Sequence, residues 1–237
     1  MASDAERIAY FLLKNVTRAI GEFNLINAGD RIAVAVSGGK DSRAMLELLL
    51  LHRRKAVYHY ELLALHVVGT AAGFPDLRRE LVPWFEGLGV DYHFVPLELP
   101  PEETLPLDCF RCSWNRRKAL FTHAADLGCR KLALGHHADD AAATALMNLM
   151  FNGQIETMAP HVEFFDKAMT LIRPLIYLPR KDLARYAQAA GYPDDPPCPQ
   201  GLTSKREQIQ NLLQQFGRDQ KQIRANLWRA ARRAMGF

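Results

Sequence analysis

The chain has 237 residues, of which 49% are hydrophobic and 24% charged, and a formal net charge of +4, which suits one soluble α/β domain with a modest appendage. Its longest apolar runs fall far short of the roughly 20 residues that a membrane-spanning helix needs, which excludes a membrane role. The first six residues contain neither a basic stretch nor an apolar run of signal-peptide type, so a cytoplasmic protein is expected.

Segments of strand type alternate with segments of helical period, which is typical of a parallel sheet with helical crossovers. An opening helix is expected over residues 4–23, because its apolar residues recur at helical spacing. Right-handed crossovers between four strands predict a doubly wound, Rossmann-like sheet. These strands are expected at 31–36, 61–68, 92–97 and 131–136, and their helices at 41–52, 76–88, 115–127 and 139–151.

The last part of the chain changes character. An extended segment at 168–175 contains Arg173-Pro174 and is expected at the sheet edge, because proline cannot donate a ladder hydrogen bond. In the last stretch, from Lys205 to Arg233, basic residues far outnumber acidic ones, which suits a phosphate backbone, although most such runs are solvated helix faces. The sequence predicts an α/β ATP-binding domain at 1–178 and a basic helical region at 179–237, with helices at 180–190, 204–216 and 219–235.

A glycine-containing loop stands where the first buried strand turns into a helix. Its glycines let the backbone approach a phosphate closely, the helix N-terminus supplies N–H donors, and two serines add hydroxyl groups. Lys40 can neutralise phosphate charge, and Asp41 can hold Mg²⁺ on the departing pyrophosphate. A turn that caps a helix by chance is the alternative; the earlier glycine of a Walker A loop is missing. The loop reads Ser37-Gly38-Gly39-Lys40-Asp41-Ser42.

This loop resembles the PP-loop of the N-type ATP pyrophosphatase superfamily. The resemblance implies an adenine nucleotide alpha hydrolase-like sheet, ATP and Mg²⁺ as cofactors, and cleavage between the α- and β-phosphates. Members of the superfamily adenylate a carbonyl-type oxygen and then displace AMP with a nitrogen or sulfur nucleophile.

A second motif, Gly135-His136-His137-Ala138-Asp139-Asp140, follows the fourth expected strand and opens a helix. It therefore lies at the carboxyl end of the sheet, where open α/β sheets bind ligands. Asp139 is equally well explained as a helix N-cap, whereas Asp140 suits Mg²⁺ or the orientation of ATP. The two histidines are as readily core residues as ligands.

Together with Thr144 and Asn148, this motif resembles the TtcA-type tRNA 2-thiocytidine synthetases and their TtuA-type 2-thiouridine relatives. Further matches are Gly73-Phe74-Pro75, Gly153 and Arg173-Pro174-Leu175, so that the likeness covers about residues 31–198. Asp41 and Asp140 are the carboxylates expected to act in catalysis. The expected ATP-binding residues are Ser37, Gly38, Gly39, Lys40, Asp41, Ser42, His66, Gly135 and Asp140.

The chain has four cysteines. In a reducing cytoplasm the pair Cys109-x-x-Cys112 indicates metal or redox chemistry rather than a structural disulfide. It is expected in a loop at the start of the helix after the third strand, at the same end of the sheet as the phosphate loop. Cys198, in a proline-rich turn, is the natural third ligand. Cys129 leads into a strand and is expected to be a buried small hydrophobe.

In the thiolase families that this chain resembles, a C-x-x-C pair and one later cysteine hold a [4Fe-4S] cluster with one open iron. Carried over, the ligands would be Cys109, Cys112 and Cys198, with Cys109 and Cys112 taking part in catalysis. The alternative is persulfide chemistry on Cys109 or Cys112. The chain departs from the pattern because no second cysteine follows Cys198, and because the further C-x-x-C pairs of TtuA-type zinc fingers are absent, which leaves the substrate open.

Basic and aromatic residues next to this pair suggest an RNA-binding surface. Phe110 and Trp114 could stack on an unpaired base, as in the recognition of single-stranded RNA. A core position for Trp114 is equally reasonable. The basic residues expected to contact the RNA backbone are Arg111, Arg116, Arg117 and Lys118.

The function expected from these features is ATP-dependent tRNA thiolation: adenylation of a base oxygen, that of an anticodon-loop cytidine, followed by sulfur transfer through a [4Fe-4S] cluster. The expected partners are tRNA and a sulfur donor, either sulfide or a cysteine desulfurase, with a homodimer as one oligomeric state. Three alternatives stay open. They are an ATP-dependent ligase of lysidine- or amide-forming type with structural or zinc-bound cysteines, 2-thiouridine synthesis, and a nucleotide sensor without turnover.

Overall fold

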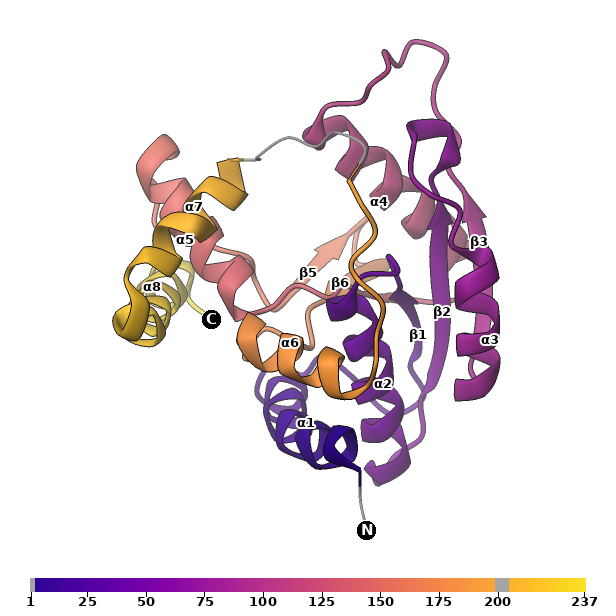
Figure 1. The fold of residues 1–237 in the computed structure, drawn as a ribbon, viewed down its shortest axis with the longest axis horizontal. Helices are drawn as coiled ribbons and strands as arrows, with labels where there is room; N and C mark the ends of the chain where they lie inside the picture. Colours follow the sequence, from indigo (N-terminus) through magenta and orange to yellow (C-terminus); the bar gives the residue numbers. More distant parts are fainter. Residues whose placement is uncertain (1–2, 199–204) are drawn as a thin grey trace.

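The computed structural model describes residues 3–198 and 205–237, and its central feature is a six-stranded sheet with helices on both faces (Figure 1). The spatial order is β3-β2-β1-β4-β6-β5, and every pairing is parallel except that of β5 with β6. The predicted fold class is therefore confirmed. The strands are β1 Arg31–Ala35, β2 Glu61–Val68, β3 Asp91–Pro96, β4 Lys131–Ala133, β5 His161–Phe164 and β6 Met169–Ile172.

Eight α-helices and two short 3₁₀ turns connect the strands in the part of the chain that the structure describes. Most begin within three residues of the predicted position, but α4 begins at Cys109 rather than near 115. The residue at 204, where one helix was expected to start, lies outside the described residues. The helices are α1 Asp4–Glu22, α2 Lys40–Lys55, α3 Arg78–Leu88, α4 Cys109–Asp126, α5 Ala138–Asn152, α6 Arg180–Ala189, α7 Lys205–Gln215 and α8 Gln220–Met235, and the turns are η1 Thr70–Ala72 and η2 Gly217–Asp219.

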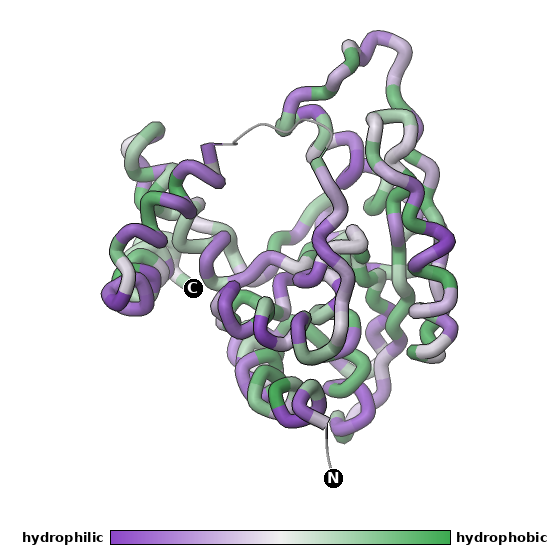
Figure 2. The backbone as a smooth tube through the Cα atoms, viewed as in Figure 1, coloured by the Kyte–Doolittle hydropathy of each residue, from purple (hydrophilic) through white to green (hydrophobic). Residues whose placement is uncertain are grey.

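Alternate side chains of β1 belong to two different cores, which shows which helices cover each face of the sheet. Ile32 and Val34 belong to a core that contains buried side chains of α1, α2, α3 and α6, whereas Ala33 packs with buried residues of α4. Successive side chains of a strand point to opposite faces, so a fully apolar strand requires helices on both. Figure 2 agrees, because hydrophobic residues concentrate in the central strands and alternate with hydrophilic ones along the helices.

The prediction that the proline-containing segment lies at the sheet edge is wrong. β6 pairs with β4 on one side and with β5 on the other. It tolerates Pro174 because the strand ends at Ile172, so the proline stands outside the ladder and no hydrogen bond is lost. The described sheet ends instead at the antiparallel β5, which the sequence did not predict.

The C-terminal helices pack on two different partners. α6 packs on α1 and α2, and its Leu183 and Tyr186 are buried in the same core as those helices. In contrast, α7 and α8 pack on α5, and Figure 1 shows these three helices grouped to one side of the sheet. The packing partners thus change after α6, while the boundary between 178 and 179 stays a prediction. No helix among the described residues is long and apolar enough to cross a bilayer.

We expect Phe85→Ala to lower the free energy of unfolding by about 3–5 kcal/mol, because the ring is fully buried and packs on Trp84, Tyr92 and Phe94. Urea denaturation measures this change. Phe11→Ala is the matched control, since that ring is 64% exposed, and it should cost less than about 0.5 kcal/mol. Equal losses in the two variants would contradict the assignment of this face as the core.

Candidate functional site

The candidate site lies where the phosphate loop and the segment after β4 meet. β1 and β4 are neighbours in the sheet, but the chain between them crosses from one face to the other. Such a switch point opens a crevice at the carboxyl ends of the two strands. The two segments touch there, because a β-carbon at Gly135 would lie 3.4 Å from backbone atoms of Asp41 and Ser42.

Hydrogen bonds hold the phosphate loop in one tight turn. Gly38 has φ +90°, which L side chains rarely adopt. The Ser42 hydroxyl donates to the Gly39 carbonyl at 2.8 Å and accepts from the Ser37 amide at 3.1 Å. The buried Arg43 donates from Nε to the Gly38 carbonyl at 2.8 Å and pairs through its guanidinium with Glu80. The loop conformation is therefore set by its own side chains and by α3.

Asp41 is the carboxylate that faces this loop. Its Oδ2 lies 3.5 Å from Lys40 Nζ and 3.8 Å from His137 Nε2. Its Oδ1 is buried and accepts no hydrogen bond among the described residues. Burial raises the pKa of Asp41, and the nearby His137 and Lys40 oppose that shift. A buried carboxylate oxygen without a partner beside a phosphate loop fits Mg²⁺, which is bound in proteins by carboxylate oxygens.

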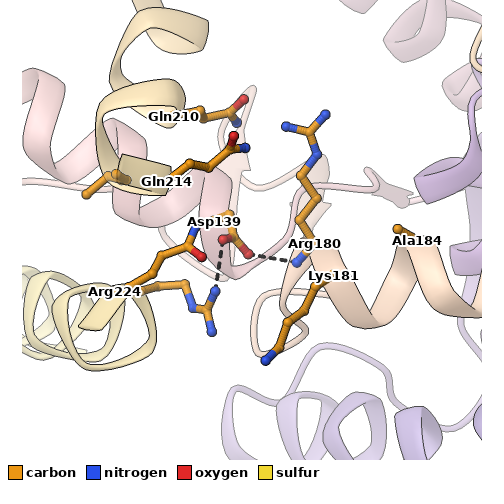
Figure 3. Close-up of a pocket in the computed structure, with 9 residues that line it drawn as sticks. Asp139, Arg180, Lys181, Ala184, Gln210, Gln214 and Arg224 are labelled. Carbon is orange, nitrogen blue, oxygen red and sulfur yellow. Dashed lines mark hydrogen bonds and ion pairs between the residues drawn. The ribbon is translucent and has the colours of Figure 1, made fainter. Parts of the chain in front are cut away.

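The hydrogen bonds of Asp139 and Asp140 go to residues outside the phosphate loop. Asp140 completes a capping box with His137: the His137 backbone N–H donates to Asp140 Oδ2 at 3.0 Å. Asp140 Oδ1 accepts from the Gln210 side chain at 3.2 Å. Asp139 accepts from the Arg180 backbone N–H at 2.7 Å and from the Arg224 guanidinium at 2.8 Å (Figure 3). Asp139 thus ties α5 to α6 and α8 and is not the N-cap, and the proposed role of Asp140 in ATP binding stays a prediction.

His66 is buried in β2 behind the loop. Its Nδ1 lies 2.8 Å from the Val36 carbonyl oxygen, and burial lowers its pKa. Its neighbours Leu65 and Val67 line the cavity described next, so His66 points to the other face of the strand. A contact of His66 with ATP is a prediction that this placement does not favour.

A cavity of about 570 Å³ opens beside the phosphate loop, within the range of small-molecule sites. Its walls are the loop itself, the first turns of α4, the segment after β4 and the segment that follows α6. Cys109, Cys112 and Cys198 all line it. Polar residues on the same walls are Ser37, Asp41, Ser42, Ser113, Arg116, Arg117, His136 and Asp195.

The helix start at Cys109 places the cysteine pair. Asp108 caps α4 by accepting from the Arg111 amide at 2.7 Å. Residues three apart on a helix share a face, so Cys109 and Cys112 turn together toward the cavity. Burial raises the pKa of the Cys112 thiol, while Arg116 lowers it. All four cysteines are free thiols, and Cys129 is buried in the core as predicted.

The three cavity-lining thiols fit an iron–sulfur cluster better than a single metal ion. Among the described residues, no three His, Cys, Asp or Glu side chains stand close enough to bind one ion. The thiolates of a cluster bind different iron atoms and therefore lie further apart than the ligands of one zinc ion. Two of the three thiols belong to one helix turn and the third to a separate segment, which is compatible with such spacing.

The residues predicted to bind RNA divide into two groups. Arg116 and Arg117 line the cavity, and Lys118 is exposed beside the Trp114 ring. Arg111 instead forms an ion pair with Glu103, so its charge is neutralised locally. Trp114 is 42% exposed, which argues against a core position.

A second, smaller cavity of about 290 Å³ lies between the N-termini of α5 and α6 and the helices α7 and α8. Figure 3 shows Arg224 and Arg180 meeting Asp139, with two glutamines of α7 above them. Its polar lining residues are Asp139, Arg180, Lys181, Gln210, Gln214, Gln220 and Arg224.

Comparison with known proteins identifies the family. A family model described as a PP-loop domain matches residues 114–197. The chain is 35% identical over 226 residues to the tRNA-cytidine(32) 2-sulfurtransferase of Bordetella pertussis, covering 91% of this chain and 69% of that protein. It is 36% identical over 217 residues to the protein of the same name from Aeromonas hydrophila, covering 87% and 70%.

The chain belongs to the tRNA-cytidine(32) 2-sulfurtransferase family. The solved structure of the U34-tRNA thiolase NcsA from Methanococcus maripaludis with its [4Fe-4S] cluster has the same fold. The TM-score is 0.76 at 24% sequence identity, covering 98% of this chain and 80% of that one. The resemblance predicted from the two motifs is therefore confirmed.

Sequence reasoning missed several side chains of the site in this 2-sulfurtransferase family member. Arg43 supports the loop from α2, and His137 stands between Asp41 and Asp140 at 3.8 and 3.4 Å. His137 was weighed only as a core residue or a ligand. Asp195 contacts the loop from a position 155 residues away, and no local pattern marks it. Only the adjacency of the two loops at the sheet edge could have indicated His137.

Replacing the loop glycine tests this geometry. We expect Gly38→Ala to weaken the binding of ATP by about tenfold, because a left-handed conformation costs an L residue roughly 1–2 kcal/mol. Isothermal titration calorimetry measures the change. Gly87→Ala, at an open position inside α3, is the control and should leave ATP binding unchanged. Wild-type affinity in Gly38→Ala would mean that the loop does not hold the nucleotide.

Asp41→Asn tests the burial of that carboxylate. The pKa of Asp41 is raised in the folded state, so its contribution to stability is present below the usual carboxyl pKa of about 4 and is lost as pH rises through the raised value. In Mg²⁺-free buffer the variant should therefore have a higher Tm than wild type at pH 7, and the difference should shrink toward pH 4. ATP turnover should be lost.

The control for this experiment is Asp194→Asn, which removes the same charge from an exposed position. It should change neither the Tm difference between pH 7 and pH 4 nor the turnover. An Asp41→Asn protein less stable than wild type at pH 7 would contradict the assigned direction.

Proposed function

We propose that this protein replaces the C2 oxygen of a tRNA cytidine by sulfur in an ATP-dependent reaction. The main observation that supports this proposal is that Cys109, Cys112 and Cys198 line the same cavity as the phosphate loop and Asp41. The names of its relatives, tRNA-cytidine(32) 2-sulfurtransferases, support cytidine at position 32 as the substrate. The name of the NcsA structure, a tRNA thiolase with a [4Fe-4S] cluster, supports the same class of chemistry.

The first half of the reaction uses the phosphate loop. The amides and hydroxyls of residues 37–42 and the Lys40 ammonium bind the phosphates, and Asp41 would hold Mg²⁺, which would supply further positive charge there. The C2 oxygen of the cytidine attacks the α-phosphorus, an O–P bond forms, and the bond to pyrophosphate breaks. The loop donors and the Lys40 ammonium stabilise the charge that develops on the leaving pyrophosphate. The base is then activated as an O-adenylate.

The second half uses the thiols. A sulfur nucleophile forms a bond to C2, and the C2–O bond breaks with release of AMP, which carries the oxygen away. Cys109, Cys112 and Cys198 would hold a [4Fe-4S] cluster, which supplies an open iron able to bind hydrosulfide. Arg116 lies on the cavity wall beside Cys112 and favours the thiolate form of that ligand.

The RNA would approach over α4. Arg117 and Lys118 are exposed there, and the exposed Phe110 and Trp114 rings offer faces on which a base can stack. Sulfide or a cysteine desulfurase is the proposed sulfur source, and the proposed location is a reducing cytoplasm, which keeps thiols free. A homodimer stays a prediction. A ligase with merely structural cysteines would not explain why three thiols line the wall of the nucleotide cavity.

Anaerobic reconstitution tests the proposal. Wild type and Cys129→Ala should bind iron and, with ATP, Mg²⁺ and sulfide, should form 2-thiocytidine in an unmodified tRNA transcript, as measured by mass spectrometry of its nucleosides. Cys109→Ala, Cys112→Ala and Cys198→Ala should lose both the iron and the product. Cys129 is the matched control because its thiol is buried away from the cavity.

Two results would contradict the proposal. Full thiolation activity in an iron-free protein would exclude a role for the cluster and would favour persulfide chemistry. AMP release that depends on lysine or ammonia, in a zinc-containing protein, would indicate a ligase. In a strain lacking the protein, the tRNA nucleosides should lack 2-thiocytidine; a missing 2-thiouridine instead would change the assigned base.

A further inference from the structure

A carboxylate of this chain contacts the phosphate loop at donors that suit a phosphate. Asp195 Oδ1 accepts from the Lys40 backbone N–H at 2.7 Å, and Oδ2 accepts from Lys40 Nζ at 2.5 Å. A β-carbon at Gly39 would lie only 3.1 Å from Oδ1, so the carboxylate lies close against the loop backbone. In shape and charge this contact resembles a bound phosphate oxygen pair at a helix N-terminus.

The contact is charged and open to solvent. Burial alone would raise the pKa of Asp195. The two hydrogen bonds from Lys40 and its positive charge lower the pKa by more than burial raises it, so the net shift is downward. The side chains of Lys40 and Asp195 are 18% and 47% exposed, and Asp195 lines the cavity. A partly exposed ion pair of this kind can exchange for a competing anion.

The same segment carries a cysteine of the cavity. Asp195, Pro196 and Cys198 all line it, and the Pro196-Pro197 pair between the carboxylate and the thiol restricts the backbone. Figure 1 shows this segment running from α6 past the start of α2. Only the two prolines separate the residue that carries the carboxylate from the residue that carries the thiol, so the positions of these two groups are linked.

We propose that Asp195 is a positioning residue that competes with the phosphates of ATP for Lys40 and, once displaced, moves the Cys198 segment. This inference rests on the proposed function, in that it takes the loop to be an ATP site. A phosphate oxygen cannot take the Lys40 backbone N–H while Asp195 Oδ1 accepts from it, and the two negative charges beside Lys40 Nζ repel one another. ATP therefore binds at the expense of the Lys40–Asp195 pair, and the thiol segment changes its place when the nucleotide enters.

The coupling is reciprocal by thermodynamic linkage. An interaction that holds Cys198 where Asp195 contacts the loop weakens ATP binding. An interaction that holds Cys198 away from that position strengthens ATP binding. Sulfur delivery and adenylation, which use groups that line one cavity, thus become ordered through a single side chain.

Asp195→Asn tests this proposal in the full-length holoprotein. The amide keeps the shape of the side chain and loses its charge, so the Kd of a non-hydrolysable ATP analogue should fall by about three- to tenfold. The KM for ATP should fall by a similar factor, and kcat should not rise. Asp194→Asn is the matched control, with the same charge change one residue away, and should bind as wild type does.

Hydrogen exchange of the peptide over residues 192–198 gives a second readout. In wild type the exchange should become faster when the ATP analogue is added. In Asp195→Asn it should already be fast without nucleotide, since the contact that anchors the segment is weakened. A segment whose exchange does not respond to the nucleotide in wild type would overturn the inference.

The outcomes separate the two proposals. Analogue binding in all three proteins, with Asp195→Asn equal to or weaker than wild type, overturns the inference alone; weaker binding assigns Asp195 to the nucleotide site itself. Folded wild type and Asp194→Asn proteins that bind no analogue overturn the proposed function, and the inference with it.

Discussion

β1 pairs in parallel with β2 on one side and with β4 on the other, and the chain reaches β4 only by crossing to the opposite face of the sheet. This arrangement places two loops side by side at one edge, with a crevice between them. The phosphate loop, Asp41, the first turn of α4 and the segment after β4 all meet there because the strands that precede them end at the same edge. Without that pairing the site would be scattered over the molecule.

The elements of the sheet core could be predicted from the sequence, because buried parallel strands and the helices between them have strong and different periodicities. β5 was not predicted and β6 was wrongly placed at the sheet edge, since each has only four residues and no local pattern indicates which strands pair. The early start of α4 was missed because the first turn after the N-cap Asp108 carries the pair Cys109-x-x-Cys112, which indicated a ligand-bearing loop. Local sequence patterns thus failed to predict the elements whose position depends on tertiary contacts.

The site divides in the same way. The phosphate loop and the three cysteines were found because glycines, a lysine and cysteines in fixed spacing have few other uses. The capping box of His137 and Asp140 was not predicted, because a carboxylate at the start of a helix can serve as a cap or as a ligand, and the role of Asp140 in ATP binding stays a prediction. No local sequence pattern predicts the role of Asp195, since its partner Lys40 lies 155 residues earlier in the chain.

The contact between Gly135 and the backbone of Asp41 and Ser42 has a consequence for how such sites diversify. At Gly135 the two segments meet main chain against main chain, with no side chain of residue 135 between them. Side chains on the walls can therefore be exchanged while the distance from the phosphates to the opposite wall is conserved. A frame of this kind keeps the activation step constant and leaves the choice of nucleophile to the residues that line the rest of the cavity.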